Sequence, residues 1–390
     1  MAANIEDLEE GRLASTSVKW ITHLFSLFVI AGMTAGVYAT MAGHHIAYGI
    51  SREIPWGILT SSFAFFAISS TGLCLIAAIS HAYGVTPLRP LGTRAVYLAI
   101  VTTVTAFMLL VFSVESPWLF IYYNAASPSL TSNLWWLSTL YGIMAGGMFL
   151  RFAFLVSGSQ GLALTFGIIA AVTGVGANNN LGGLFTLAAD PAIWFGIQLL
   201  VLFLASAVLS GTAAIIIFTV LAYKLRKQSI VGETHKALET AATLQALMIG
   251  IVLVVTIARF YSMFFSDTPD PGIVAARALI NGPLAVNFWG FEIFTGLLLP
   301  LTLLLISKTR SVWVMTLASC MALVGGYVQR FDLIYGGQIV PKFSGWNELP
   351  QYFHYFPSGA ELIVVIGAFS LVGFGFLMGE RFVGKLFRIY

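Results

Sequence analysis

The chain has 390 residues, of which 58% are hydrophobic and only 9% are charged, and its mean hydropathy is +0.90. These values exclude a soluble globular enzyme with one buried core and are typical of a protein that crosses a membrane many times. The formal net charge of +3 is too small for a nucleic-acid-binding protein, so we expect no nucleic acid among the partners.

The chain begins with a polar, acidic segment, residues 1–19. A secretory signal would instead begin with basic residues and continue at once into an apolar stretch. We therefore expect a short cytoplasmic leader here.

Ten apolar runs follow the leader, and each is long enough to cross roughly 30 Å of hydrocarbon as a helix. They fall at residues 20–41, 58–79, 95–114, 134–154, 160–176, 193–222, 242–265, 285–306, 312–334 and 361–379. The sequence therefore predicts an all-α, polytopic membrane protein.

We expect a single integral membrane domain built from two four-helix bundles plus peripheral helices. Residues 20–176 would form the first bundle, and residues 193–379 the second. Residues 380–390 would be a cytoplasmic tail.

Basic residues divide unevenly between the two sides of this ten-helix arrangement. With the N-terminus inside, 14 of the 19 Lys and Arg residues fall on the cytoplasmic side. This is the asymmetry that the positive-inside rule requires, and a nine-helix arrangement would destroy it. The pattern predicts a multi-pass protein of the cytoplasmic (inner) membrane with both termini in the cytoplasm.

Cysteine and histidine usage bears on metal cofactors. The two cysteines, Cys74 and Cys320, lie inside apolar runs and form no iron–sulfur, zinc or disulfide pattern. The six histidines do not repeat along one helix at the spacing of two stacked haems. We expect no metal site, no intrinsic haem and no iron–sulfur cluster in this chain.

Five ionisable residues of four consecutive predicted helices reach a similar level on the outer side of the membrane. They are Arg259, Glu292, Arg330, Asp332 and Glu361. Charges at membrane depth are costly, and they either pair or serve a function. We expect the pairs Arg259–Glu292 and Arg330–Glu361. The cluster would be either a structural ion-pair network or a proton route.

A second polar set lies near the outer ends of the first five predicted helices. It contains His44, Glu115, Trp118, Tyr141 and Asn178. A tryptophan at the headgroup level is often only part of an interfacial aromatic belt. Together, however, these residues offer proton acceptors and hydrogen-bond donors beside lipid-accessible space.

Six stretches of the chain look familiar in their order and spacing. They read HAYGVTPLRPLGTRA at 81–95, SPWLFIYYNAASP at 116–128, NNNLGGLFTLAADPAIWFGIQ at 178–198, LASAVLSGTA at 204–213, QRFDLIYGGQ at 329–338 and YFPSGAELIVVIGAF at 355–369. With them, the chain resembles the NrfD/PsrC family of quinone-interacting membrane subunits. The closer likeness is to its ten-helix branch, HybB-like and DsrP-like proteins.

The resemblance implies a membrane subunit that binds menaquinone or ubiquinone non-covalently near the outer face, usually in the first bundle. It also implies a ferredoxin-like four-cluster iron–sulfur subunit as partner, with further redox subunits in the same complex. The family's Arg and Gly-Gly-Gln pattern falls on Arg330 and residues 336–338, and its acid of the tenth helix falls on Glu361.

Two departures from the family pattern fall in the expected quinone pocket. The relatives' Asp-Leu-Gly-Arg is Ser-Val-Glu-Ser at residues 113–116, so Glu115 would replace the acid two residues later in the chain, on another face of the helix. Asn178 and its neighbours stand where the branch often has a histidine.

We therefore expect a quinone-reactive subunit of a respiratory redox complex, in which proton movement accompanies electron transfer to the partner. Glu115 and His44 would exchange protons, and Tyr141 and Asn178 would hydrogen-bond the quinone oxygens. Two alternatives remain open. One is a structural membrane anchor without quinone turnover, and the other is a secondary transporter, which would be expected to show inverted repeats and broken helices.

Overall fold

The computed structural model describes residues 16–82, 86–187, 197–264, 271–341 and 350–388, and within these ranges the chain is helical with no strand. Ten helices of the described residues are long and apolar enough to cross a membrane. They are α2 (Thr16–Ala42), α4 (Ile58–Ala82), α5 (Arg89–Ser113), α7 (Asn133–Val156), α8 (Gln160–Leu187), α9 (Ile197–Leu225), α10 (Gly232–Phe264), the π-helical η3 (Asn287–Leu298) continued by α12 (Leu299–Ile306), α13 (Val312–Gly336) and α14 (Gly359–Phe382). The predicted all-α polytopic fold is confirmed.

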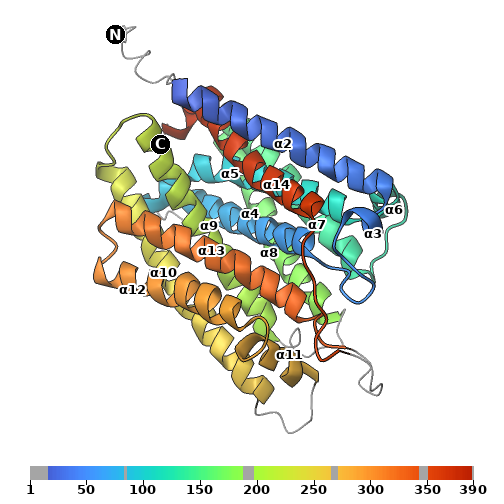
Figure 1. Ribbon diagram of the computed structural model, residues 1–390. Coiled ribbons are helices and arrows are strands. Elements are labelled where there is room, and N and C mark those ends of the chain that lie inside the picture. The colour runs from blue at the N-terminus through green and yellow to red at the C-terminus, as the bar shows by residue number, and fades with distance from the viewer. Residues whose placement is uncertain (1–15, 83–85, 188–196, 265–270, 342–349, 389–390) are drawn as a thin grey trace, which may run out of the picture.

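The long helices run side by side, so that their connections lie at two opposite ends of the molecule (Figure 1). α2 begins and α14 finishes at the same end, which we call the terminal end. The opposite, distal end carries three short helices, α3 (His44–Ala47), α6 (Pro117–Ala126) and α11 (Pro271–Ile280). Two single 3₁₀ turns complete the elements, η1 (Thr86–Leu88) and η4 (Leu386–Arg388).

α4 is the central helix, with α5, α8, α9 and α13 packed around it. The backbone of α9 approaches it closely, because a Cβ added at Gly72 would overlap the carbonyl group of Ala207, and one added at Gly211 would overlap the Gly72 backbone. Small residues allow this approach, which is how helices associate where lipid removes the hydrophobic driving force.

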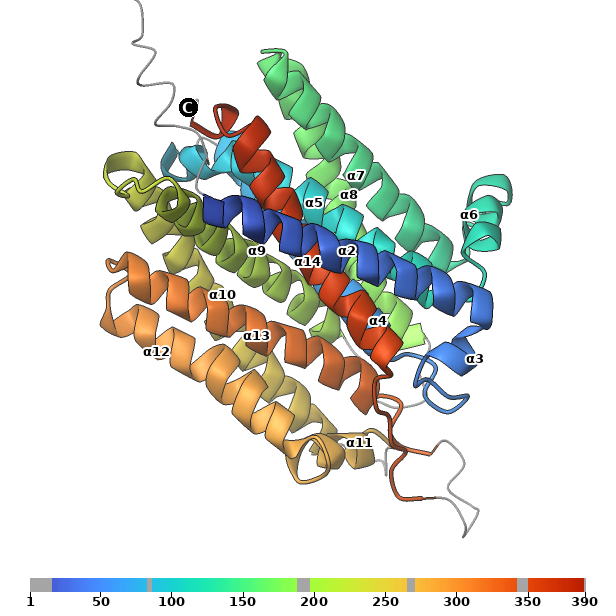
Figure 2. The ribbon, with the colours of Figure 1, turned by 45° about the horizontal axis from the view of Figure 1, so that its top comes forward.

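α2 and α14 come from opposite ends of the chain and pack together on one side of the molecule (Figure 2). Their closest contact joins Gly32 to Gly367, where a Cβ on either residue would lie 2.8 Å from the other's Cα. The first and last spans therefore support each other.

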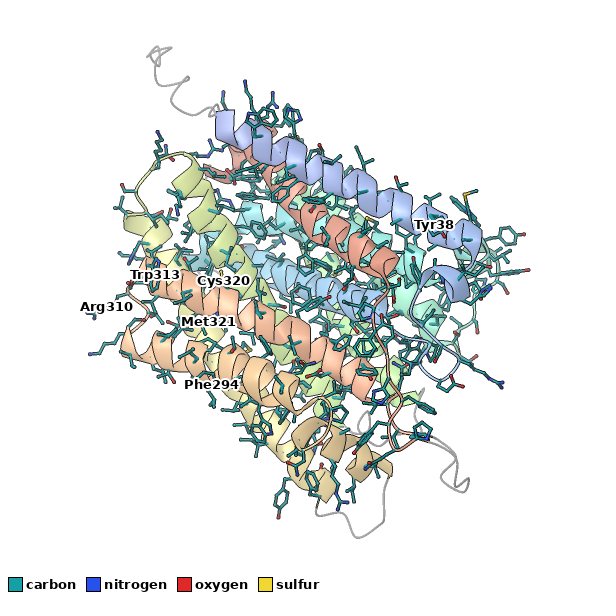
Figure 3. All side chains as sticks on the ribbon, in the orientation of Figure 1. Tyr38, Phe294, Arg310, Trp313, Cys320 and Met321 are labelled. Atoms are coloured by element: carbon teal, nitrogen blue, oxygen red, sulfur yellow. The ribbon has the colours of Figure 1, made fainter. Side chains whose placement is uncertain are left out.

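The outer surface of the long helices is apolar. Tyr38 on α2, Phe294 on η3 and Trp313 on α13 extend away from the bundle (Figure 3), and they are 55%, 57% and 71% exposed. A surface of this kind suits contact with lipid rather than water.

A buried ion triad joins three helices at the terminal end. Glu380 of α14 accepts a 3.0 Å hydrogen bond from Arg94 of α5 and a 2.8 Å hydrogen bond from Arg226, which follows α9. One carboxylate thus faces two guanidinium groups, and sequence reasoning did not identify this contact. The Arg94 guanidinium has a further partner in Thr219, whose hydroxyl accepts a hydrogen bond from it at 3.3 Å.

Candidate functional site

The turn after α2 positions the first histidine of the candidate site. Gly43 has a φ of 93°, a left-handed conformation that glycine adopts without strain, and it directs the chain into the four-residue helix α3. His44 is buried there with 4% of its surface exposed. Its ring lies 4.7 Å from that of Tyr48, whose hydroxyl donates a 3.0 Å hydrogen bond to the Phe112 carbonyl.

The His44 imidazole lies in the electrostatic field of two carboxylates. Burial lowers the pKa of His44 below its ordinary value of 6.5, while Glu115 and Glu361 partly offset this effect. The ring is therefore neutral near pH 7. Its Nε2 atom has no hydrogen-bond partner among the described residues, so it is available to a ligand.

Glu361, in the first turn of α14, holds the distal loops together with three hydrogen bonds. It accepts 2.8 Å bonds from the backbone N–H groups of Gly49 and Ser358, and a 2.6 Å bond from the Tyr355 hydroxyl. Ser358 in turn accepts from the Glu361 N–H, which completes a capping box. Burial and the neighbouring Glu361 carboxylate raise the pKa of Tyr355, so its hydroxyl stays protonated and donates.

Gln338 holds the same loop from the end of α13. Its amide accepts a 3.0 Å hydrogen bond from the Trp56 N–H and donates a 2.9 Å bond to the Trp56 carbonyl. It also donates to the Ile334 carbonyl at 2.8 Å. The Gln of the Gly-Gly-Gln pattern therefore fixes the loop between α3 and α4 as a strand partner would.

The expected ion pair between Arg330 and Glu361 is wrong. Arg330 donates a hydrogen bond to the Ser206 hydroxyl, and its guanidinium lies 4.6 Å from the centre of the Phe203 ring. Arg330 faces α9 in the interior, whereas Glu361 faces the distal loops. The two residues were predicted to lie at a similar depth in the membrane, but their side chains point in different directions from their helices.

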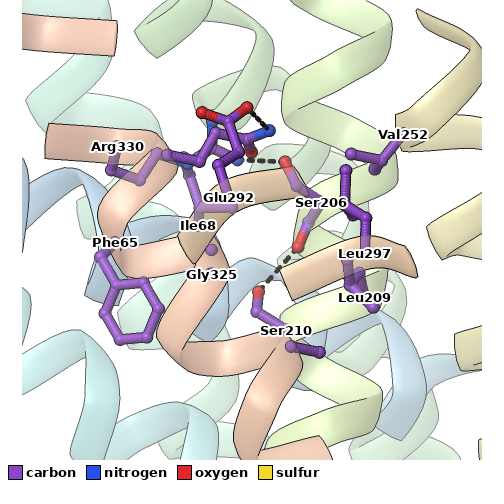
Figure 4. A pocket seen from close by; sticks show the side chains of 13 residues that line it. Phe65, Ile68, Ser206, Leu209, Ser210, Val252, Glu292, Leu297, Gly325 and Arg330 are labelled. Atoms are coloured by element: carbon purple, nitrogen blue, oxygen red, sulfur yellow. Dashed lines mark hydrogen bonds between the residues drawn. The ribbon is translucent and has the colours of Figure 1, made fainter. Parts of the chain in front are cut away.

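We call the buried polar group around Arg330 the interior cluster, and Figure 4 shows part of it. Its members are Arg259, Glu292, Gln329, Arg330 and Asp332. Electrostatic interactions join Glu292 to Arg259 and to Arg330. The carboxylate of Glu292 also accepts a 2.8 Å hydrogen bond from Gln329, and that of Asp332 accepts a 3.0 Å bond from Asn287.

A cavity of about 20 Å³ lies against the interior cluster, lined in part by Ser206, Ser210, Glu292 and Arg330. This is enough space for one water molecule between polar groups. Glu292 stands on the π-helical segment η3, and π-helical turns inside helices are frequent at functional sites.

The sequence-predicted quinone residues divide into two groups. Glu115 and Trp118 are exposed at the distal end, Trp118 by 80%, and Glu115 is within electrostatic reach of the buried His44. Tyr141 and Asn178 instead lie deep between α7, α8 and α4, with 3% and 0% of their surfaces exposed.

Tyr141 connects this deeper group to the interior cluster. Its hydroxyl lies beside Thr71 of α4 and within electrostatic reach of Arg330. Neither side-chain polar atom of Asn178 has a hydrogen-bond partner among the described residues. We name His44, Tyr48, Glu115, Tyr355 and Glu361 the distal site, since the structure gathers them at one end.

Tyr48, Tyr355 and Gln329 take part in these contacts although sequence reasoning did not single them out. A signal was available for the start of α14, because the Ser-x-x-Glu spacing of residues 358–361 is that of a capping box. Among the described residues no three His, Cys, Asp or Glu side chains are grouped as metal ligands.

The comparisons with known proteins agree on one family. The family model described as polysulphide reductase, NrfD, matches residues 47–342. The chain is 20% identical over 383 residues to the Hdr-like menaquinol oxidoreductase integral membrane subunit of Archaeoglobus fulgidus, a match that covers 93% of each chain. It is 27% identical over 210 residues to a selenate reductase subunit of Mesobacillus selenatarsenatis, covering 53% of this chain and 48% of that protein. The ten-helix chain belongs to the NrfD family of membrane proteins.

Proposed function

We propose that this chain is the quinone-reactive subunit of a membrane redox complex, and that its distal site exchanges protons with the quinone. The observation that carries the proposal is the buried, neutral His44 ring, whose Nε2 atom has no partner among the described residues. The name of the archaeal relative, a menaquinol oxidoreductase subunit, supports menaquinol over ubiquinol as the substrate.

A quinol that is oxidised releases two electrons and two protons. We propose that His44 Nε2 accepts a proton and that Glu115, exposed beside it, passes protons to the outer solution. Trp118, on the exposed face of α6, would flank the path by which the quinone enters from the lipid. Tyr141 and Asn178 would bind a quinone oxygen only if the ring reaches below the distal site.

The electrons must leave through another subunit. We propose that a ferredoxin-like four-cluster iron–sulfur subunit docks at the distal end and that further redox subunits complete the complex. The words "subunit" in both relatives' names and "oxidoreductase" in one support a multi-subunit assembly.

The proton-acceptor role is tested by His44→Gln in the intact complex, with His45→Gln as the matched control. His45 is the next residue and its side chain is exposed. We expect quinol oxidation to fall by roughly 10²-fold for His44→Gln, the size of effect that positioned acid–base groups have, and to stay unchanged for His45→Gln. Equal rates for both variants would leave the structural-anchor alternative in place.

The position in the cell is a further part of the proposal. We propose that the protein lies in the cytoplasmic membrane with the terminal end inside, because 14 of its 19 basic residues then face the cytoplasm. Reporter fusions after Lys227 and after Tyr390 should both read cytoplasmic, and one after Ser129 should read external. A cytoplasmic reading at Ser129 would reverse the orientation.

For the interior cluster we propose a structural role, in which opposite charges hold α10, η3 and α13 together and Arg330 binds Ser206 of α9. Glu292 lies between two arginines and accepts a hydrogen bond from Gln329, so its charge is compensated. The water-sized cavity beside it favours a second candidate, a proton route from the distal site into the membrane. The Glu292 variant described below distinguishes the two.

A further inference from the structure

A second, larger cavity lies between the long helices, near the middles of α13 and α14. Its volume is about 340 Å³, and α4, α5, α9, α13 and α14 contribute its walls. α4 is visible between α13 and α14 in Figure 1. The residues that matter for its chemistry are Phe65, Phe66, Ser69, Val324, Tyr327 and Phe369.

We call this the inter-bundle cavity, because helices of both bundles predicted from the sequence line it, and aromatic rings form one of its sides. The rings of Phe65 and Tyr327 meet edge to face at 5.4 Å, and Phe369 lies 4.9 Å from Phe66 and 5.6 Å from Tyr327. Rings arranged in this way leave flat faces and edges against which another planar ring packs favourably. An aromatic wall of this kind favours a flat ligand more than a wall of aliphatic side chains would.

A single hydroxyl group in the described wall lacks a partner. Ser69 is 4% exposed, and its Oγ atom makes no hydrogen bond to any described residue. The other hydroxyls of the lining are satisfied, since Thr102 donates to the Leu98 carbonyl at 2.8 Å and Tyr327 pairs with Ser62 at 2.9 Å. A buried donor without an acceptor is unfavourable, and a hydrocarbon chain offers it nothing.

The cavity opens toward lipid. Val324 of α13 and Phe369 of α14 stand at its edge and are 48% and 44% exposed. Among the described residues, its lining carries no charged side chain. The occupant is therefore neutral, reaches the cavity from within the bilayer, packs on aromatic rings and supplies an oxygen acceptor for Ser69.

We propose that this inter-bundle cavity binds the head ring of a second quinone molecule, with a ring carbonyl accepting a hydrogen bond from Ser69. Tyr327 is the one titratable side chain in the described lining and is already paired with Ser62. The site therefore holds and delivers quinone and does not exchange protons with it. It shares no residue with the distal site, although α14 contributes to both, and it stands or falls independently of that site.

The experiment uses the full-length protein in lipid nanodiscs with a photoreactive azidoquinone, followed by mass spectrometry of the labelled peptides. We expect two labelled regions, one around residues 43–57 and one in α4, α13 or α14. An excess of unmodified quinone should reduce labelling of both. Because each region is read separately, failure of the distal site and failure of the inter-bundle site are distinguishable.

Two variants probe the inter-bundle site. Val324→Trp closes its mouth and should lower labelling of α4, α13 and α14 at least tenfold, while Val254→Trp, on the lipid-exposed face of α10, should not. Ser69→Ala should weaken quinone binding there about fivefold, as expected for one lost hydrogen bond. Ser70→Ala is its control, because the Ser70 hydroxyl donates to the Ala67 carbonyl of its own helix.

Labelling confined to residues 43–57 would overturn the proposal. The same holds if α4, α13 and α14 are labelled equally in wild type, Val324→Trp and Ser69→Ala. Native mass spectrometry provides an independent measurement: retention of phospholipid alone, with no quinone displaced by Val324→Trp, would assign the cavity to an acyl chain instead.

Discussion

The carboxylate of Glu361 accepts a 2.8 Å hydrogen bond from the backbone N–H of Gly49, a residue 312 positions earlier in the chain. This contact joins the beginning of the last transmembrane helix to the loop that follows the first. Since His44 lies on that same loop, the acid maintains the geometry of the distal site without belonging to its reacting groups.

Glu361→Gln tests this role. The side-chain amide of glutamine has one accepting oxygen, and its NH2 group would face donors, so it cannot accept all three hydrogen bonds. We therefore expect the loop of residues 43–57 to loosen. Loss of hydrogen bonds to a charged group costs about 1.5–3 kcal/mol each. Faster amide hydrogen exchange at residues 43–57 is the measurement, and Glu53→Gln, an exposed acid on the same loop, is the control. Unchanged exchange would contradict the clamp.

The protonation of His44 predicts how stability depends on pH. Burial lowers the pKa of His44 in the folded protein, so the unfolded chain binds a proton more readily than the folded one. The contribution of the neutral His44 to stability is therefore complete above about pH 6.5, and it is lost as the pH falls toward the pKa of His44 in the folded protein. We expect the Tm of the wild type to drop more between pH 7 and pH 5 than that of His44→Gln. Parallel curves would show that His44 does not carry this dependence.

Glu292→Gln tests the interior cluster. Removing the charge leaves Arg259 and Arg330 buried with less compensation, and breaking a buried ionic group in this way costs on the order of 3–5 kcal/mol. We expect a correspondingly lower free energy of unfolding, measured against Glu239→Gln near the terminal end of α10. Normal stability with a loss of proton uptake by the complex would instead identify the cluster as a proton route.

The ion triad of Glu380, Arg94 and Arg226 gives a comparable prediction at the terminal end, away from the distal site. Glu380→Gln leaves Arg94 and Arg226 facing each other with no carboxylate between them, and we expect a loss of about 3–5 kcal/mol in the free energy of unfolding. Arg381→Gln, an exposed neighbour, should change it little. Quinone binding by the residual folded protein should be normal, which separates this effect from those at the distal end.

Much of the fold could be predicted from the sequence, because twenty apolar residues in a bilayer have few alternatives to a helix. The ends of the helices are predicted least well where polar residues belong to a helix. α10 begins at Gly232 instead of residue 242, because its first turns carry Glu233, Lys236 and Glu239 and are polar yet helical. Likewise, α8 continues past residue 176 to Leu187, through the three asparagines.

The candidate site could be predicted less well, for a physical reason. Depth along a helix follows from residue number, but direction around the axis depends on the packing of neighbouring helices. The sequence assigns Arg330 and Glu361 to a similar depth, and yet one faces Ser206 and the other faces Gly49. The π-helical turns of η3 shift the register further at Glu292, and no sequence pattern signals them.

The packing of α2 on α14 has a consequence for biosynthesis. A ribosome adds roughly 5–20 residues per second, so more than 300 residues separate the emergence of Gly32 from that of Gly367 by many seconds. During this interval α2 must persist in the bilayer without α14, which its internally satisfied backbone permits. A ribosome that stalls before the last span would release a chain with an unoccupied glycine face and an unanchored loop at Gly49. Such a chain is incomplete both within the membrane, at Gly32, and at the distal end, at Gly49.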